Sequence, residues 1–142
     1  MSAVFGMRPA AARIWLPRMT RSSPFLATRT DTVDPEIARI GLSEKEARAR
    51  GIPYRVARLP MAAVLRTRTL SETRGFTKAL VEADGDRILG CTVFGVEASA
   101  ILSTVQVAML AGLPYTALRD AVFAHPTVAE GLGSVFSNIP PR

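Results

Sequence analysis

The stretch FTKALVEADGDRILGCTVFG, residues 76–95, decides the fold of this chain. Its Asp84-Gly85 dipeptide predicts a tight turn, because glycine accepts the positive φ that short hairpin turns require. Two apolar arms, residues 76–82 and 87–95, flank the turn. The second arm is apolar at nearly every position, which is typical of a strand covered on both faces. The stretch therefore predicts a β-hairpin whose second arm is a central strand.

Further elements lie on both sides of this hairpin. Residues 36–41 and 54–59 are strand candidates, and the capping box formed by Ser43 and Glu46 predicts a short helix between them. After the hairpin, apolar residues at helical spacing predict a helix over 97–111, followed by two shorter helices over 115–122 and 128–136. Hairpin-linked strands with helices gathered at the end predict an α+β fold. We expect an antiparallel sheet of about four strands with helices packed on one face.

The N-terminal segment differs in composition from the rest of the chain. Five of the 18 basic residues and none of the 12 acidic residues lie within residues 1–30, and prolines interrupt the segment. We expect a basic, poorly ordered extension over residues 1–32 and a folded domain over 33–142. Three alternatives stay open for the extension: an organellar transit peptide, a segment that contacts an acidic surface, or residues left from a longer chain.

Charge and cysteine content exclude several classes of function. The formal net charge of +6 comes almost entirely from the extension, whereas a nucleic-acid-binding domain spreads basic groups over its folded surface. No apolar run reaches the ~18–20 residues of a membrane span. A single cysteine, Cys91, excludes an internal disulfide and a cysteine-rich zinc site, and its apolar surroundings predict a buried core thiol. We expect no nucleic-acid partner, no membrane span and a cytoplasmic location.

The single histidine, His125, is the main candidate for proton chemistry. An imidazole exchanges a proton near neutral pH and works best when a partner orients its far nitrogen. Glu130 is the candidate partner, provided that Pro126 turns the chain back at a helix start. Two structural explanations remain beside this one. Thr127 and Glu130 also form a capping-box pattern, and a histidine before proline can be an ordinary turn residue. The chain has no second histidine for a metal site.

Five short stretches, taken together, resemble a known family. In order they are DPEIARIG (34–41), SEKEAR (43–48), GFTKALV (75–81), RILG (87–90) and HPTVAE (125–130). They are similar to the C-terminal dimerisation domain of flavin-dependent pyridine nucleotide–disulfide oxidoreductases, which include dihydrolipoamide dehydrogenase, glutathione reductase and mercuric reductase. The resemblance covers residues 33–141, about three quarters of the chain. Two features depart from the family pattern: residues 25–33 match its leading strand badly, and Ala100 stands where an acidic residue is common.

The resemblance implies a two-fold interface domain with no cofactor of its own. FAD and NAD(P) belong to other domains of the family, and their GxGxxG and CxxxxC motifs are missing from this sequence. By resemblance, His125 faces the redox disulfide of the partner subunit and exchanges protons with the substrate thiol, while Glu130 holds its ring. We expect a homodimer, formed through the helix from Glu97 and residues 128–139, or an association with flavin and nucleotide domains. The isolated chain is expected to lack redox turnover. The alternative is a non-enzymatic homodimerisation module with a purely structural His–Glu pair.

Overall fold

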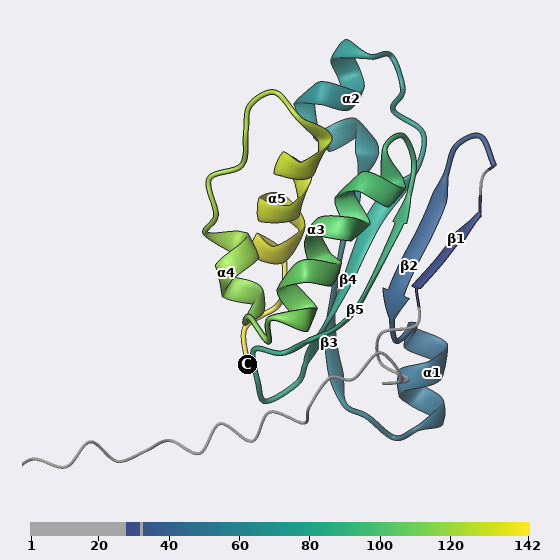
Figure 1. Cartoon of the computed structure of the whole chain (residues 1–142). Helices are drawn as coiled ribbons and strands as arrows, with labels where there is room; N and C mark the ends of the chain where they lie inside the picture. The colour runs from purple at the N-terminus through teal and green to yellow at the C-terminus, as the bar shows by residue number, and fades with distance from the viewer. Residues whose placement is uncertain (1–27, 32) are drawn as a thin grey trace, which may run out of the picture.

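A five-stranded antiparallel sheet forms the centre of the protein (Figure 1). The computed structural model describes residues 28–31 and 33–142. In sheet order the strands are β1 (Thr28–Asp31), β2 (Ile37–Gly41), β5 (Ile88–Phe94), β4 (Phe76–Glu82) and β3 (Tyr54–Pro60). The hairpin predicted around Asp84-Gly85 is confirmed as β4–β5, and β5 is the central strand of the sheet.

The α+β prediction is confirmed, and the sheet has one strand more than the expected four or so. β1 pairs antiparallel with β2 at the edge of the sheet, and all four of its residues are exposed. It lies inside the segment that the sequence analysis assigned to the extension. The sequence TRTD shows no apolar alternation, so only its pairing with β2 identifies it as a strand. The rest of that expected extension, residues 1–27 and residue 32, lies outside the described residues.

Three helices cover one face of the sheet: α3 (Ala98–Leu110), α4 (Tyr115–Arg119) and α5 (Gly131–Ser137), preceded by the 3-10 turn η3 (Val128–Glu130). Alternate sheet residues point toward them and are fully buried, among them Ala79, Cys91 and Val93. Helix residues that complete this core include Leu102, Val105, Leu132, Val135 and Phe136. The connection after β3 holds two short elements, η2 (Met61–Ala63) and α2 (Leu65–Thr69), at the end of the sheet.

The first helix, α1 (Glu44–Ala49), packs on the opposite face, so the expectation that all helices share one face is wrong. Its capping box is confirmed: Ser43 Oγ accepts the Glu46 N–H, and Glu46 accepts the Ser43 N–H. A small cluster of Leu42, Ala47, Leu80 and Leu89 holds α1 to the sheet. A register shift beside Leu80 leaves Leu89 without a partner residue on β4. As a result, the Leu89 side chain points away from the main core. That shift gives α1 an apolar surface to cover.

The buried cysteine has no accessible reactive thiol. Cys91 lies in β5 with none of its surface exposed, as the sequence analysis predicted. Burial raises the pKa of the Cys91 thiol to about 12, so the thiolate, which is the reactive form, is disfavoured. None of the described helices combines the length and apolar character of a membrane span.

Candidate functional site

The loop between α4 and η3 presents His125 at the surface. Phe123 packs against the core on one side of the histidine, and Val128 is buried on the other. The Thr127 hydroxyl donates to the Ala124 carbonyl at 2.7 Å and holds the turn between these two anchors. The His125 side chain keeps 64% of its surface exposed. The fold therefore fixes the backbone on both sides of an imidazole that remains accessible.

Glu130 makes two contacts at once. Its Oε1 lies 2.6 Å from His125 Nδ1, and its Oε2 accepts the Thr127 backbone N–H at 3.1 Å. The sequence leaves ring orientation and helix capping as alternatives, but a carboxylate has an oxygen for each. An ionised carboxylate can only accept, so Nδ1 carries the proton in this contact. In the neutral ring the lone pair is then on Nε2, the nitrogen that does not contact Glu130.

Hydrogen bonds keep Glu130 ionised. The bond from His125 lowers the pKa of the Glu130 carboxyl below its ordinary value of 4.5, and the bond from the Thr127 N–H lowers it further. Because the folded pKa is lowered, these contacts stabilise the fold above the ordinary glutamate pKa. That stability is lost as the pH falls through the lowered folded pKa. At neutral pH the imidazole therefore lies beside a negatively charged carboxylate.

We expect His125→Ala to raise the pKa of Glu130 toward 4.5, because the largest cause of its lowering is removed. Carbon-13 NMR of the side-chain carboxyl, followed from pH 2 to 7, measures this change. Glu46 is the matched control, since its pKa is lowered by Ser43 in the other capping box and it has no histidine contact. An unchanged Glu130 titration in the variant, or an equal change at Glu46, would contradict the pairing.

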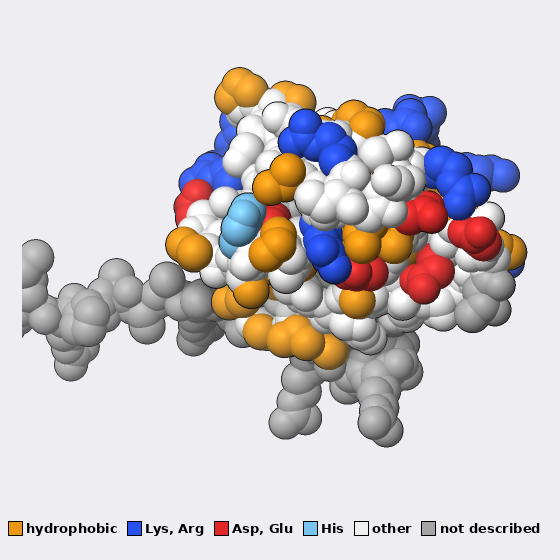
Figure 2. All heavy atoms as spheres, turned by 90° about the horizontal axis from the view of Figure 1, so that it is seen from above, with side chains coloured by type: hydrophobic (Ala, Val, Ile, Leu, Met, Phe, Trp, Pro, Cys, Tyr) orange, Lys and Arg blue, Asp and Glu red, His pale blue; other side chains and the backbone are white. Residues whose placement is uncertain are grey.

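Exposed apolar side chains surround the imidazole (Figure 2). Val122 is fully exposed, and the neighbouring residues Ala121, Ala124 and Pro126 are exposed as well. The sequence pattern does not reveal these exposed residues, because it predicts a helix up to residue 122, whereas α4 ends at Arg119. Exposed apolar residues gathered around a polar group are typical of a surface that another chain covers. The buried Cys91 thiol is not part of this site.

A second apolar surface lies at the end of α3. Val107, Leu110 and Leu113 are 66%, 51% and 44% exposed, although their neighbours Ala108 and Met109 are buried in the core. We call these three residues the α3 patch. The sequence predicts that this helix takes part in the dimer interface. Among the described residues, no group of three or more histidine, cysteine, aspartate or glutamate side chains could hold a metal ion.

Comparison with known proteins places the fold of this chain in one class. The family model described as "Pyridine nucleotide-disulphide oxidoreductase, dimerisation domain" matches residues 29–135. The chain belongs to this family, and the resemblance found in the sequence is confirmed.

Two curated relatives show which proteins carry such a domain. The chain is 40% identical over 103 residues to the probable pyridine nucleotide-disulfide oxidoreductase RclA of Escherichia coli, covering 72% of this chain and 23% of that protein. It is 36% identical over 96 residues to dihydrolipoamide dehydrogenase of Chaetomium thermophilum, covering 68% of this chain and 19% of the relative. The chain thus spans between 19% and 23% of the length of these two relatives.

Solved structures agree with these comparisons. The HOCl-induced flavoprotein disulfide reductase RclA of Escherichia coli matches with a TM-score of 0.76 at 37% identity, over 79% of this chain and 26% of that one. LpdA of Mycobacterium tuberculosis has a TM-score of 0.75 at 19% identity, over 81% of this chain and 25% of that one. At that identity the second likeness shows a shared fold alone.

Proposed function

We propose that this domain pairs with a second copy and brings His125 and Glu130 into the thiol–disulfide site of the partner subunit. The observation that carries the proposal is the 2.6 Å contact between His125 Nδ1 and Glu130 Oε1 beneath an exposed ring. A surface histidine without a role needs no oriented tautomer. Here the ring is oriented, and Nε2 is available to a group outside the chain.

The chemistry follows from the tautomer. A substrate thiol beside Nε2 gives up its proton to the ring, and the resulting thiolate is the form that attacks a disulfide. The sulfur–sulfur bond that breaks releases a second thiolate, which takes the proton back from the imidazolium. Glu130 stays ionised throughout, orients the ring and stabilises its positive charge. The pair therefore moves one proton in each direction without being consumed.

The described residues do not fit a flavin. Two of the hollows on the surface are open grooves of about 280 and 320 Å³ on the sheet, and the chain has no GxGxxG loop. Relatives named as flavoproteins imply that FAD, and with it NAD(P), is held by domains outside this chain. Electron transfer belongs to those domains, so the residues described here supply assembly and proton exchange. A cytoplasmic location stays a prediction.

The dimer part of the proposal rests on the α3 patch. Monomeric proteins seldom expose several large apolar side chains together, and a two-fold interface brings the same patch of two copies into contact. The exposed apolar residues around His125 form a second surface that a partner chain would cover.

A non-enzymatic homodimerisation module is the second candidate. The contact from Thr127 N–H to Glu130 Oε2 favours it, because this contact alone caps η3 without any role for the histidine. Both candidates predict a dimer, so assembly does not separate them.

A domain exchange tests the function directly. Residues 28–142 would replace the corresponding C-terminal domain of Escherichia coli RclA, which supplies the flavin and nucleotide domains. If the His–Glu pair works as proposed, the chimera turns over disulfide substrate within about tenfold of the parent. A folded, flavin-loaded and dimeric chimera without turnover would favour the non-enzymatic module.

A further inference from the structure

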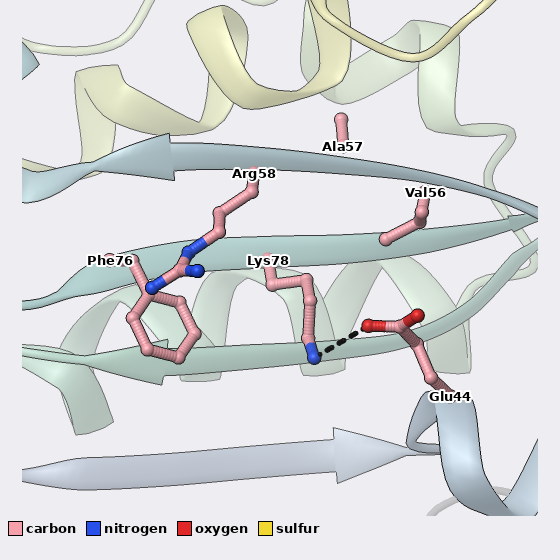
Figure 3. Close-up of a pocket in the computed structure, with 6 residues that line it drawn as sticks. All are labelled: Glu44, Val56, Ala57, Arg58, Phe76 and Lys78. Atoms are coloured by element: carbon pink, nitrogen blue, oxygen red, sulfur yellow. Dashed lines mark hydrogen bonds and ion pairs between the residues drawn. The ribbon is translucent and has the colours of Figure 1, made fainter.

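The sheet face opposite α3 and α5 carries a row of five residues, four of them basic, that crosses all five strands. The strand register places Arg29 opposite Arg39, Arg39 opposite Thr92, Thr92 opposite Lys78, and Lys78 opposite Arg58. Directly opposed residues of antiparallel strands share a face, so these five side chains form one line. We call it the cationic row. Figure 3 shows Arg58 and Lys78 of this row on neighbouring strands.

Acidic residues balance this row only in part. Arg29 pairs with Asp31 at 3.3 Å, Arg39 with Glu46 at 3.3 Å, and Lys78 with Glu44 at 2.9 Å. Arg58 instead lies over the Phe76 ring, 4.0 Å from its centroid, and makes no ion pair with an acid of the described residues. Like charges directly opposite one another destabilise a sheet. With three acids for four cations, the row keeps one positive charge without an acidic partner, that of Arg58, while Arg39 and Lys78 each share theirs with a glutamate.

Two adjoining grooves expose the middle of the row. One, of about 320 Å³, is lined by residues that include Arg39, Thr92 and Lys78. The other, of about 280 Å³, is lined by residues that include Lys78, Arg58 and Phe76 (Figure 3). Lys78 lines both grooves, and its hydrogen bond to Glu44 uses one of the three donors of an ammonium group. Cations on both sides of the Thr92 hydroxyl thus border a hollow open to solvent.

Arg39 adds an unmet hydrogen-bonding requirement. Its Nη2 donates to Glu46, while its Nε–H is buried and has no acceptor among the described residues. A buried donor without an acceptor is costly, although the Arg39 side chain as a whole is 33% exposed. Turned toward the groove, Nε and a neighbouring nitrogen would present the paired donors that arginine uses to bind carboxylate or phosphate.

We propose that the groove over Thr92 binds a small oxyanion, a phosphate or carboxylate group, between Arg39 and Lys78. The three acids that flank the row favour a small ligand, because a long polyanion would meet their negative charges. This site lies on the opposite face of the sheet from α3, α5 and the His125 loop, so it does not depend on the proposed function.

Titration of the full chain with inorganic phosphate at constant ionic strength tests the site, with acetate as the carboxylate probe. Proton–nitrogen NMR reports the Arg39 Nε–H and the Thr92 amide directly. We expect a saturable shift of both signals with at least one probe. Arg39→Gln or Lys78→Met should weaken binding at least about tenfold, since each removes a charged donor. Saturation by phosphate or by acetate identifies which oxyanion fits.

Arg68→Gln is the matched control, because it removes an exposed arginine of α2 that lines neither groove, and it should change binding less than about twofold. Thr92→Val, which alters no charge, should also weaken binding. It replaces Lys78→Met as the test variant if Lys78→Met lowers the melting temperature. Shifts that fail to saturate with both probes, or that are equal in all variants, mean an adventitious ion only and overturn the proposal.

Discussion

His125→Gln in the chimera with RclA should lower disulfide turnover at least about 100-fold, which is the lower end of what a positioned acid–base group contributes. Glutamine can hydrogen-bond to Glu130 and has a similar size, but it cannot take up a proton from a thiol. The loss should appear in kcat for the thiol–disulfide step, with flavin content and dimerisation unchanged. Steady-state turnover, absorbance of bound flavin and sedimentation together measure this.

Glu130→Gln provides the matched control for the role of the carboxylate. The amide can still reach His125 but carries no charge and can hold the wrong tautomer, so we expect a loss of turnover no larger than that from His125→Gln. A loss from Glu130→Gln larger than that from His125→Gln would argue for a structural role of the glutamate. If the His125→Gln chimera keeps more than half of the wild-type turnover, the histidine is an ordinary turn residue without a role in proton transfer.

Leu110→Glu should raise the dissociation constant of the homodimer at least about 100-fold. Burial of a leucine side chain contributes roughly 1.5–3 kcal/mol to the free energy of association, and each substitution occurs twice in a two-fold dimer. The variant also places a charge where a large apolar side chain of the α3 patch was 51% exposed. Sedimentation velocity of the full chain from about 1 to 200 μM gives the dissociation constant.

Leu65→Glu is the control for this variant. Leu65 on α2 is 43% exposed, so the same substitution there changes the surface to a similar degree outside the α3 patch. It should leave the dimer intact. A wild-type chain that stays monomeric at 200 μM, or a Leu110→Glu chain that dimerises as well as wild type, would contradict the assignment of the interface.

Local sequence signals predict much of this fold. The turn at Asp84-Gly85 and the capping box at Ser43 depend on neighbouring residues, and both elements occur where the sequence placed them. Strand β1 was missed because its side chains are all exposed and only its pairing with β2 defines it. The position of α1 was missed because a register shift at Leu80 moves Leu89 to the other face. Both misses concern contacts between distant segments.

In the candidate site too, local sequence predicts some features, and others appear only in the three-dimensional structure. The spacing of His125 and Glu130 allowed either ring orientation or capping, and only the three-dimensional arrangement shows that one carboxylate makes both contacts. The predicted helix was too long and included the exposed Val122, because no glycine or proline marks the end of α4 at Arg119. The cationic row depends on strand register, which short stretches of sequence do not specify.

Mixed dimers of the chimera test the central claim, that His125 acts in the site of the other subunit. One chimera carries His125→Gln, and the other keeps His125 but lacks the redox cysteines of the RclA portion. Each homodimer alone should be inactive. After the two are dissociated and reassociated in equal amounts, half of the dimers contain one complete site, so turnover should reach about a quarter of wild type. If the mixture stays as inactive as the two homodimers, while dimer exchange is verified, His125 does not act across the interface.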